Sequence, residues 1–313
     1  LGFHKPNMWD KVVDINKCHL QADPSNEIRN AIKIFAIDHE LEFYDPLAQK
    51  GFLRTLMIRN TLRGELMVLL QFYKEHQEKR ILLLSFLKER FPSITSILYC
   101  INIKGNDSLY DQDVFCFYGQ NYITEHLGKL QFKITAKSFY QTNPKQAETL
   151  YAIGKQFANL EGTETAYDLY SGTGTIALYI ADQCAKVIGV ESVPEAIEAA
   201  KENAILNKIE NAYFEVGDMK DCFNDEFIER HGKADVVITD PPRNGMHIDV
   251  VKQLLKLSPK KIVYISCNSA TQARDLELMK NDYSVLKSQA VDMFPQTHHV
   301  ENVVLLQRNE INE

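Results

Sequence analysis

From Pro144 to the C-terminus, short Val/Ile-rich segments alternate with amphipathic, helix-like segments. The strand-like segments are 164–170, 185–191, 211–218, 234–240 and 260–266, followed by two more near 284–292 and 300–308. Parallel strands that are buried on both faces form nearly continuous apolar runs of this kind. The alternation predicts an α/β fold with a doubly wound, Rossmann-like sheet, whose ligands bind beyond the carboxyl ends of the strands.

The first part of the chain has a different pattern, and we expect residues 1–137 and 138–313 to form separate domains. Helix-like segments near 24–40 and 77–91 are mixed with several strand-like segments, which predicts a smaller, β-rich α+β domain. Arg54, Arg59 and Arg63 recur near a predicted turn. They form either a solvated sheet face or a face that contacts phosphates.

Composition narrows the class of protein. Hydrophobic residues make up 45% of the 313 positions and charged residues 25%, which is typical of a globular protein. No apolar run approaches the roughly 18 residues of a membrane span, so no membrane partner is expected. The net charge of −7 argues weakly against a nucleic-acid partner, but residues 1–140 hold 18 basic against 16 acidic residues, whereas 141–313 hold 17 against 26.

The six cysteines form no C-x-x-C pair, so neither a disulfide framework nor a zinc site is indicated. We therefore expect no metal site in this chain and a reducing, cytoplasmic location. The monomeric state is a default expectation.

A glycine-containing turn follows the first strand of the predicted sheet. Asp168 ends that strand, Gly172 and Gly174 permit a tight turn, and Glu191 ends the next strand, where a carboxylate can accept hydrogen bonds from ribose hydroxyls. The pattern D-x-x-x-G-x-G resembles the first motif of class I S-adenosylmethionine-dependent methyltransferases. Asp218 resembles the acid near the adenine pocket of that family.

The segment Asp240-Pro-Pro-Arg243 ends another strand on the same side. Two prolines fix the backbone and hold Asp240 at the crevice. The turn resembles the (D/N)PP(Y/F/W) loop of enzymes that methylate exocyclic amines, but Arg243 stands where those enzymes place an aromatic residue.

Cys267 lies between a predicted strand and a predicted helix, unlike Cys100, Cys116, Cys184 and Cys222, which fit a buried apolar role. A helix N-terminus is expected to lower the pKa of the thiol. A thiolate beside a methyl donor can add to C6 of uracil and so activate C5 for methylation. Glu301, where the last strand begins, is the candidate base that removes the C5 proton.

Five segments together resemble the RNA (uracil-5-)-methyltransferase family of RumA/TrmA type, most closely the enzymes that modify 23S rRNA. They are SFYQTN at 138–143, DLYSGTG at 168–174, DPPR at 240–243, SCN at 266–268 and DMFPQTHHVE at 292–301. The resemblance implies Cys267 as nucleophile and Glu301 as proton acceptor. It also implies S-adenosyl-L-methionine as cofactor and Gln141, Tyr170, Glu191 and Asp240 as residues that contact it.

Two departures from the family are expected to matter. The small β-barrel that binds RNA at the N-terminus of many members is missing here, so the chain is read as a shortened one. Some members bind an iron–sulfur cluster through four cysteines, and Cys18 resembles the last of these. The other three would precede Leu1, so a cluster is expected only in a full-length protein.

The expected function is methylation of C5 of a uridine in structured RNA, with 23S rRNA as the partner, and with the base flipped out of its stack. Residues 1–137 would help to hold the RNA backbone. Three alternatives stay open: a tRNA uridine C5 methyltransferase, a methyltransferase acting on an exocyclic amine through the DPPR loop, and a non-enzymatic RNA-binding module.

Overall fold

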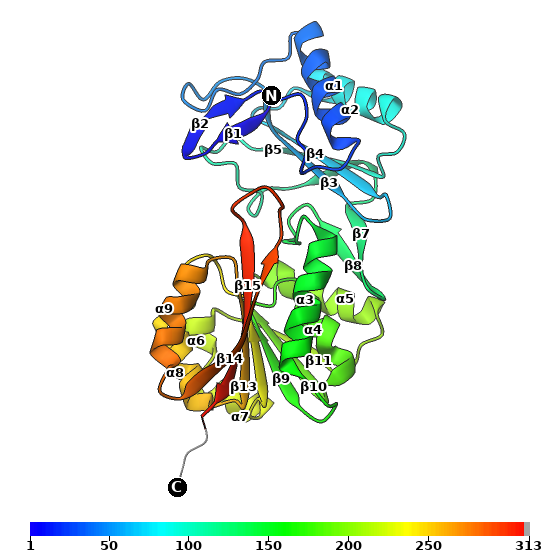
Figure 1. The fold of residues 1–313 in the computed structure, drawn as a ribbon. Coiled ribbons are helices and arrows are strands. Elements are labelled where there is room, and N and C mark those ends of the chain that lie inside the picture. The colour runs from blue at the N-terminus through cyan, green and yellow to red at the C-terminus, as the bar shows by residue number, and fades with distance from the viewer. Residues whose placement is uncertain (310–313) are drawn as a thin grey trace. The chain divides into compact units, whose positions relative to one another are not determined.

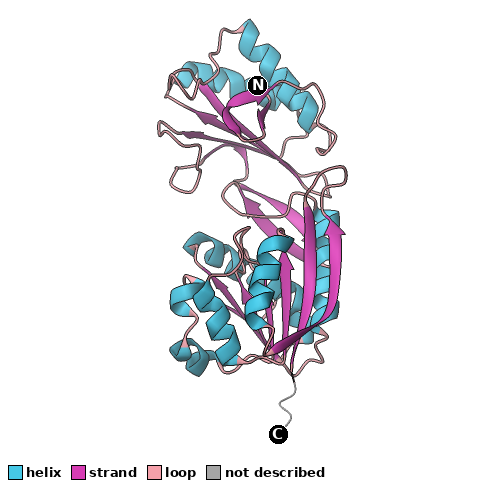
Figure 2. Cartoon of the chain, turned by 60° about the vertical axis from the view of Figure 1, so that its left-hand side comes forward, coloured by secondary structure: helices cyan, strands magenta, loops and turns pink. Residues whose placement is uncertain are grey.

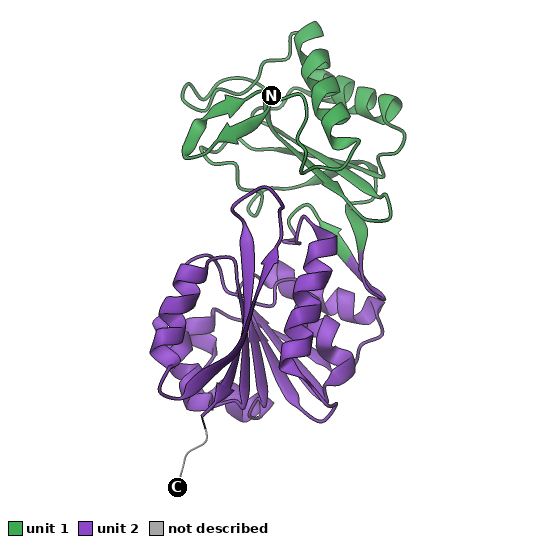
Figure 3. Ribbon diagram, viewed as in Figure 1, with its two compact units in different colours: residues 1–125, 133–137 green, residues 126–132, 138–313 purple. Residues whose placement is uncertain are grey.

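The computed structural model describes residues 1–309, which form two compact units (Figure 3). Unit 1 contains residues 1–125 and 133–137, and unit 2 contains residues 126–132 and the chain from Ser138 onward. The segment 126–132 lies within a hairpin of β7 (Tyr122–Leu127) and β8 (Leu130–Thr135), whose strands both cross the division.

Unit 1 is built on a four-stranded sheet in the order β3-β4-β5-β6. Its strands are β3 (Leu53–Asn60), β4 (Leu66–Phe72), β5 (Ser96–Ile101) and β6 (Phe115–Gly119). The β4–β5 pair is parallel and the other two pairs are antiparallel. The helices α1 (Ser25–Asp38) and α2 (Gln77–Arg90) pack against one another, and their apolar residues join those of the strands in one core that includes Ile28, Leu70 and Leu84.

The structure adds elements to unit 1 that the sequence pattern did not reveal. A short hairpin, β1 (Phe3–Lys5) and β2 (Met8–Val13), precedes the first helix, and β7 was not expected. The guanidinium of Arg54, one of the three arginines near the predicted turn, donates to the carbonyls of Asn102 and Asn106 at 2.8 and 2.6 Å. It therefore ties the loop after β5 to β3.

Unit 2 contains a seven-stranded sheet in the order β11-β10-β9-β12-β13-β15-β14 (Figure 1). Its strands are β9 (Thr165–Leu169), β10 (Lys186–Glu191), β11 (Ala212–Val216), β12 (Val236–Thr239), β13 (Lys261–Ser266), β14 (Tyr283–Asp292) and β15 (Val300–Arg308). The pairs from β11 to β13 are parallel, and β15 runs antiparallel to both of its neighbours. The strand order reverses between β9 and β12, which is where doubly wound sheets bind ligands.

Helices cover both faces of this sheet (Figures 1 and 2). The helices are α3 (Pro144–Ala158), α4 (Thr175–Ile180), α5 (Pro194–Leu206), α6 (Met219–Cys222), α7 (Asp225–His231), α8 (Ile248–Leu257) and α9 (Ser269–Met279), with a 3-10 turn at Ala181–Gln183. One layer contains α3, α4 and α5, and the other contains α6, α8 and α9. The expected doubly wound α/β fold is therefore confirmed.

The helices of unit 2 include one with a clear capping signal and two that were not expected. Asn143 caps α3, since its side chain accepts the backbone N–H of Gln146 at 3.4 Å, and Pro144 is the first helical residue. In contrast, α6 and α7 were not expected between β11 and β12. They are only 4 and 7 residues long, which is too short for helical periodicity to emerge.

Candidate active site

The carboxyl ends of the central strands bring the expected site residues to one edge of the sheet. Tyr170, Asp240 and Cys267 directly follow β9, β12 and β13, and Glu191 is the last residue of β10. Asp168 on β9 lies between Gly189 on β10 and Ile238 on β12. Side chains that are distant in sequence therefore meet at the switch point of the sheet.

The turn after β9 has an unusual backbone. Tyr170 has φ 65° and Gly172 has φ 53°, in the left-handed region that residues other than glycine adopt at a cost. Gly174 has φ 79°, and a Cβ atom there would lie 2.8 Å from Cζ of Phe214 and 3.0 Å from Cβ of Ala200. Gly174 is thus required both for its conformation and for close packing on β11 and α5.

Asp168 is fully buried beneath this turn. Its Oδ2 accepts the backbone N–H of Ala177 at 2.9 Å, while Oδ1 has no hydrogen-bond partner in the described part of the chain. Burial, reinforced by the charge of Glu191, raises the pKa of Asp168 to about 7. Ser171 Oγ is a second buried atom without a partner among residues 1–309. An unsatisfied buried acceptor is costly, so these atoms mark a place where a ligand could bind.

The carboxylate of Glu191, at the end of β10, accepts hydrogen bonds that hold the turn after β9. Its Oε2 accepts the N–H of Gly172 at 3.1 Å, and its Oε1 accepts the N–H groups of Ser192 and Val193 at 2.7 and 3.0 Å. Asp218 follows β11, is exposed, and accepts the N–H of Lys220 at 3.2 Å as the cap of α6. Both carboxylates thus combine an anchoring role with an accessible position.

The segment before α3 contributes Gln141, which is half-buried and hydrogen-bonds the hydroxyl of Tyr151. Tyr151 is buried, and burial together with the nearby charge of Asp240 raises its pKa well above the usual value. Phe139, two residues earlier, is 67% exposed although it is a large aromatic residue. The sequence motif SFYQTN included Phe139, but only the structure shows that its ring is accessible.

The ladder of β13 and β15 brings Cys267 and Glu301 to the same end of the two strands. Ser266, the last residue of β13, pairs with Asn302, so Cys267 directly follows one member of this pair and Glu301 directly precedes the other. Cys267 is exposed and Glu301 is half-buried. They are far apart in sequence, and both lie next to the last pair of one hydrogen-bonded ladder.

The expectation that the helix N-terminus lowers the pKa of Cys267 is wrong for this structure. Partial burial and the carboxylates of Glu301 and Asp240 raise the pKa of the thiol, while Arg243 opposes them. Burial also raises the pKa of Glu301, again against the effect of Arg243. The pKa of Asp240 is raised well above its usual range by burial first, then by Glu301 and Asp168. Burial is the largest cause of all three raised pKa values, and the neighbouring carboxylates add to it for Cys267 and Asp240.

Arg243 is the site residue whose importance the sequence did not reveal. The sequence indicated it as part of the DPPR segment and as a departure from the amine-methylating loop, but gave it no role; in the structure its positive charge acts on both Cys267 and Glu301. Its guanidinium also lies 3.3 Å from Nδ1 of His299, in the segment that leads to β15. The loop after β12 and the start of β15 therefore meet through this arginine.

The other thiols have different surroundings. Cys100 and Cys184 are buried as expected, and burial raises their pKa values to about 11 and 12. Cys222 is half-buried, also with a pKa of about 11. Cys116 was expected to be buried but is exposed on β6, because that strand has mostly exposed side chains. Of these four, only Cys116 shares the accessibility of Cys267.

Neither a metal centre nor a membrane helix is found in the described part of the chain. Residues 1–309 contain no cluster of three or more His, Cys, Asp or Glu side chains that could bind a metal ion. Cys18 is half-buried with a free thiol. Within the same residues, no helix has the length and apolar character to span a bilayer.

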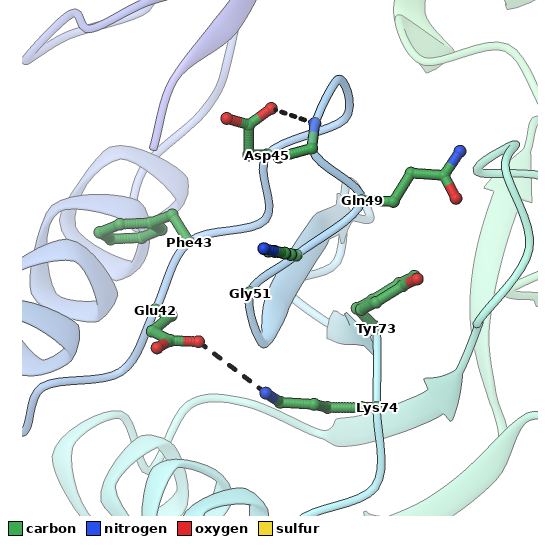
Figure 4. A pocket seen from close by; sticks show the side chains of 9 residues that line it. Glu42, Phe43, Asp45, Gln49, Gly51, Tyr73 and Lys74 are labelled. Carbon is green, nitrogen blue, oxygen red and sulfur yellow. Dashed lines mark hydrogen bonds and ion pairs between the residues drawn. The ribbon is translucent and has the colours of Figure 1, made fainter.

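A hollow of about 570 Å³ lies in unit 1, lined by residues of the 42–51 loop together with Tyr73 and Lys74 (Figure 4). Three of its charged groups are already engaged, since Lys74 pairs with Glu42 at 3.9 Å and Asp45 accepts backbone N–H groups of its own loop. None of the expected site residues lines it, so the sheet edge of unit 2 is the better candidate site.

Comparisons with known proteins show the family to which this chain belongs. The model of the tRNA (uracil-5-)-methyltransferase family matches residues 36–309. An uncharacterized RNA methyltransferase of Porphyromonas gingivalis is 55% identical over 99% of this chain and 67% of its own length. One from Bacteroides thetaiotaomicron is 53% identical over 98% of this chain and 68% of its own length.

A solved structure agrees with these sequence matches. The tRNA (uracil-54, C5)-methyltransferase of Pyrococcus abyssi, in complex with S-adenosyl-L-homocysteine, superposes with a TM-score of 0.81 at 32% identity, over 97% of this chain and 72% of that one. A putative methyltransferase of Streptococcus mutans, at 14% identity, TM-score 0.54, and 95% and 83% coverage, shares the fold alone. The expected class I methyltransferase fold and enzyme class are confirmed, and the chain belongs to the tRNA (uracil-5-)-methyltransferase family.

Proposed function

We propose that the chain methylates C5 of a uridine in RNA through a covalent bond between Cys267 and C6 of the uracil ring. One observation supports the proposal: an exposed thiol and a half-buried carboxylate flank the last pair of the β13–β15 ladder, Ser266 and Asn302, and the charge of Glu301 acts on Cys267. Addition to C6 and removal of the C5 proton require these two groups on the same ring.

The residues at the switch point fit S-adenosyl-L-methionine as the cofactor. The orphaned Oδ1 of Asp168 and Oγ of Ser171 are buried polar atoms that a ligand with donor groups would satisfy. The Pyrococcus enzyme binds the demethylated product of this cofactor. Residues proposed to hold it are Gln141, Asp168, Tyr170, Gly172, Glu191, Asp218 and Asp240. When bound, the cofactor supplies an electrophilic methyl group.

The reaction then follows from the chain's own groups. The Cys267 thiolate forms a bond to C6, and the electron pair of the C5–C6 double bond makes C5 nucleophilic. After C5 has gained the methyl group, Glu301 accepts the C5 proton, the double bond re-forms and the C6–sulfur bond breaks. Because burial raises the pKa of Glu301, this carboxylate is a stronger base than an exposed glutamate.

The ring must leave its stack before it can meet Cys267, and the structure offers an aromatic side chain for this purpose. Phe139 is 67% exposed and precedes Gln141 by two residues. Proteins that flip bases commonly hold them by stacking on aromatic side chains. Phe139 is therefore proposed to stack on the flipped uracil or on a neighbouring base.

Unit 1 is proposed to bind the RNA around the target. Its strand β6 exposes Phe115 by 48% and Tyr118 by 39%, and the ammonium group of Lys88 lies 4.7 Å from the centre of the Tyr118 ring. Exposed aromatic rings beside cations bind single-stranded nucleic acid without strong sequence preference. Phe115→Ala should therefore weaken RNA binding without changing cofactor affinity.

For the RNA itself we propose a uridine of 23S rRNA, on the strength of the motifs described above. A tRNA uridine is the second candidate, which the Pyrococcus enzyme favours because it acts on uracil-54 of tRNA. Mapping of 5-methyluridine in rRNA and tRNA from cells with and without the gene separates the two. Loss from tRNA alone would refute the ribosomal assignment and leave the chemistry intact.

The covalent step is tested with RNA that contains 5-fluorouridine. Fluorine cannot leave C5 as a proton does, so the Cys267 adduct should persist and appear as a stable protein–RNA band after denaturation. Cys267→Ala should give no band, whereas Cys116→Ala, a change at another exposed thiol, should give the same band as the unmodified chain.

Two outcomes would reject the covalent proposal. If the chain methylates unmodified RNA but forms no adduct with the fluorinated RNA, the chemistry proceeds without Cys267. If Cys267→Ala retains methylation, an exocyclic amine held by the DPPR loop becomes the better target. Binding of RNA without any turnover would favour a binding module.

A further inference from the structure

The loop that carries Arg243 is held by Asn268, which follows Cys267 and caps α9, and by side chains of α9 itself. The carbonyl of Arg243 accepts hydrogen bonds from Asn268 Nδ2 and Thr271 Oγ1, both at 3.1 Å. The next carbonyl, that of Asn244, accepts one from Arg274 Nη2 at 2.8 Å. Consecutive backbone groups of the loop are thus bonded to successive turns of one helix.

A buried carboxylate completes this attachment. Asp275 is 1% exposed, and its Oδ2 accepts the N–H of Met246 at 2.8 Å and the hydroxyl of Tyr264 at 2.7 Å. Gly245 has φ 76°, and a Cβ atom there would lie 2.5 Å from Asp275 Oδ2. The far end of the loop is therefore fixed as firmly as the middle.

Asn268 has two tasks that require different atoms of one amide. Its Oδ1 accepts the N–H of Ala270 at 3.1 Å and so caps α9, while its Nδ2 donates to Arg243. Thr271 repeats the second task from the next turn of the helix. The helix start that positions Cys267 is the same structure that positions the backbone of Arg243.

We infer that Asn268 and Thr271 are positioning residues, which hold Arg243 so that its guanidinium stays beside Cys267 and Glu301 during the reaction. This inference rests on the proposed function for its role in catalysis. The groups that act electrostatically on Cys267 are Glu301 from β15, Asp240 after β12 and Arg243. Arg243 is the one cation among these three, so its displacement leaves the two carboxylates unopposed.

The test measures the thiol directly, so it does not depend on methyl transfer. Alkylation of Cys267 by iodoacetamide is followed against pH by peptide-resolved mass spectrometry, which separates it from the other cysteines. The test variant combines Asn268→Ser with Thr271→Val. Serine can still cap the helix but is too short to bridge to the loop, and valine has the shape of threonine without the hydroxyl.

We expect the alkylation profile of the double variant to move upward by about 0.5 pH unit, which lowers the rate at pH 8 roughly threefold. Thr149→Val is the matched control, because the Thr149 hydroxyl donates only to Lys145 of its own helix, at 3.2 Å, and this change should not move the profile. Thr271→Val alone serves if the double variant does not fold.

A cycle with Arg243→Gln assigns the effect to its cause. When Asn268→Ser and Thr271→Val are added to Arg243→Gln, the alkylation profile of Cys267 should not move further, because the positive charge that they would displace is already absent. An unchanged profile in the double variant overturns the inference, as does an equal shift with and without Arg243. Neither result bears on adduct formation with 5-fluorouridine RNA, so failure of the proposed function would be seen separately.

Discussion

The two halves of the sheet edge in unit 2 are built in different ways. At the ends of β9 and β10 the turn is held by backbone N–H groups that donate to Asp168 and Glu191. At the ends of β12, β13 and β15 the reactive groups are side chains, and their loop is held by other side chains of α9. In the first half, two carboxylates fix the shape of a turn through its backbone N–H groups; in the second half, the reactive side chains have an electrostatic balance that single substitutions can alter.

This difference suggests a division of labour. A backbone-lined turn with unsatisfied buried acceptors is suited to bind a ligand and hold it still. A thiol, two carboxylates with raised pKa values and one arginine are suited to form bonds and move protons. Substitutions in the two halves should therefore have effects of different kinds.

The largest effect is expected for Cys267→Ala in the reactive half. Without the sulfur, C5 of uracil cannot be activated, so methylation of RNA should fall by at least about 10⁴-fold. The measurement is transfer of a labelled methyl group under single-turnover conditions. Binding of S-adenosyl-L-homocysteine should be unchanged, and a loss of that binding as well would contradict the proposed separation of the halves.

Glu301→Gln comes next, with an expected loss of about 10²–10⁴-fold in turnover, as is typical for removal of a general base. The adduct should still form, because Cys267 is intact, and it should accumulate on unmodified RNA because the C5 proton stays in place. Denaturing gel electrophoresis detects it. Slow turnover without any adduct would mean that Glu301 acts before the methyl transfer rather than after it.

A third prediction concerns the binding half and is read out as stability. The pKa of Asp168 is raised to about 7, so the folded chain keeps this carboxyl protonated where the unfolded chain, with an ordinary value of about 4, has released the proton. Its contribution to stability is present below pH 4 and is lost as pH rises through 7. Relative to Asp168→Asn, the unmodified chain should lose about 2–4 kcal/mol across that range.

Denaturant unfolding of the cofactor-free chain at several pH values measures this difference. Asp221→Asn, at a carboxylate whose side chain is 72% exposed, is the control and should give curves parallel to those of the unmodified chain. If the free energy of unfolding of Asp168→Asn changes with pH in parallel with that of the unmodified chain, Asp168 is charged in the folded state.

The smallest effect is expected for Arg243→Gln. The reactive form of Cys267 is the thiolate, so the rate of adduct formation should rise with pH until it passes the raised pKa of the thiol. Loss of the arginine raises the pKa of the thiol further, so the rise in rate occurs at still higher pH. At pH 7.5 we expect about tenfold slower adduct formation. Arg243→Lys should recover part of the rate. A downward shift would contradict the electrostatic role.

Sequence patterns were sufficient for the α/β alternation, the order of the motifs and the position of Cys267 after a strand. They could not supply the direction of the pKa shift of Cys267, because it depends first on burial and then on Glu301 and Asp240, which only the folded chain brings close. They also could not reveal Arg243 as a partner of both reactive groups, since that proximity depends on how α9 holds the loop. Short helices such as α6 and the exposed face of β6 left no periodic signal.

The insertion of β15 between β13 and β14 has a consequence for how such a chain can vary. Side chains alternate between the two faces of a strand, so removal of one residue from β15 would turn Glu301 away from the sulfur while leaving the hydrophobic content of the strand almost intact. The relative position of the two reacting groups thus depends on the hydrogen-bonded register of β13 and β15. Changes of length should be tolerated in the outer loops of unit 2 and excluded from this pair of strands.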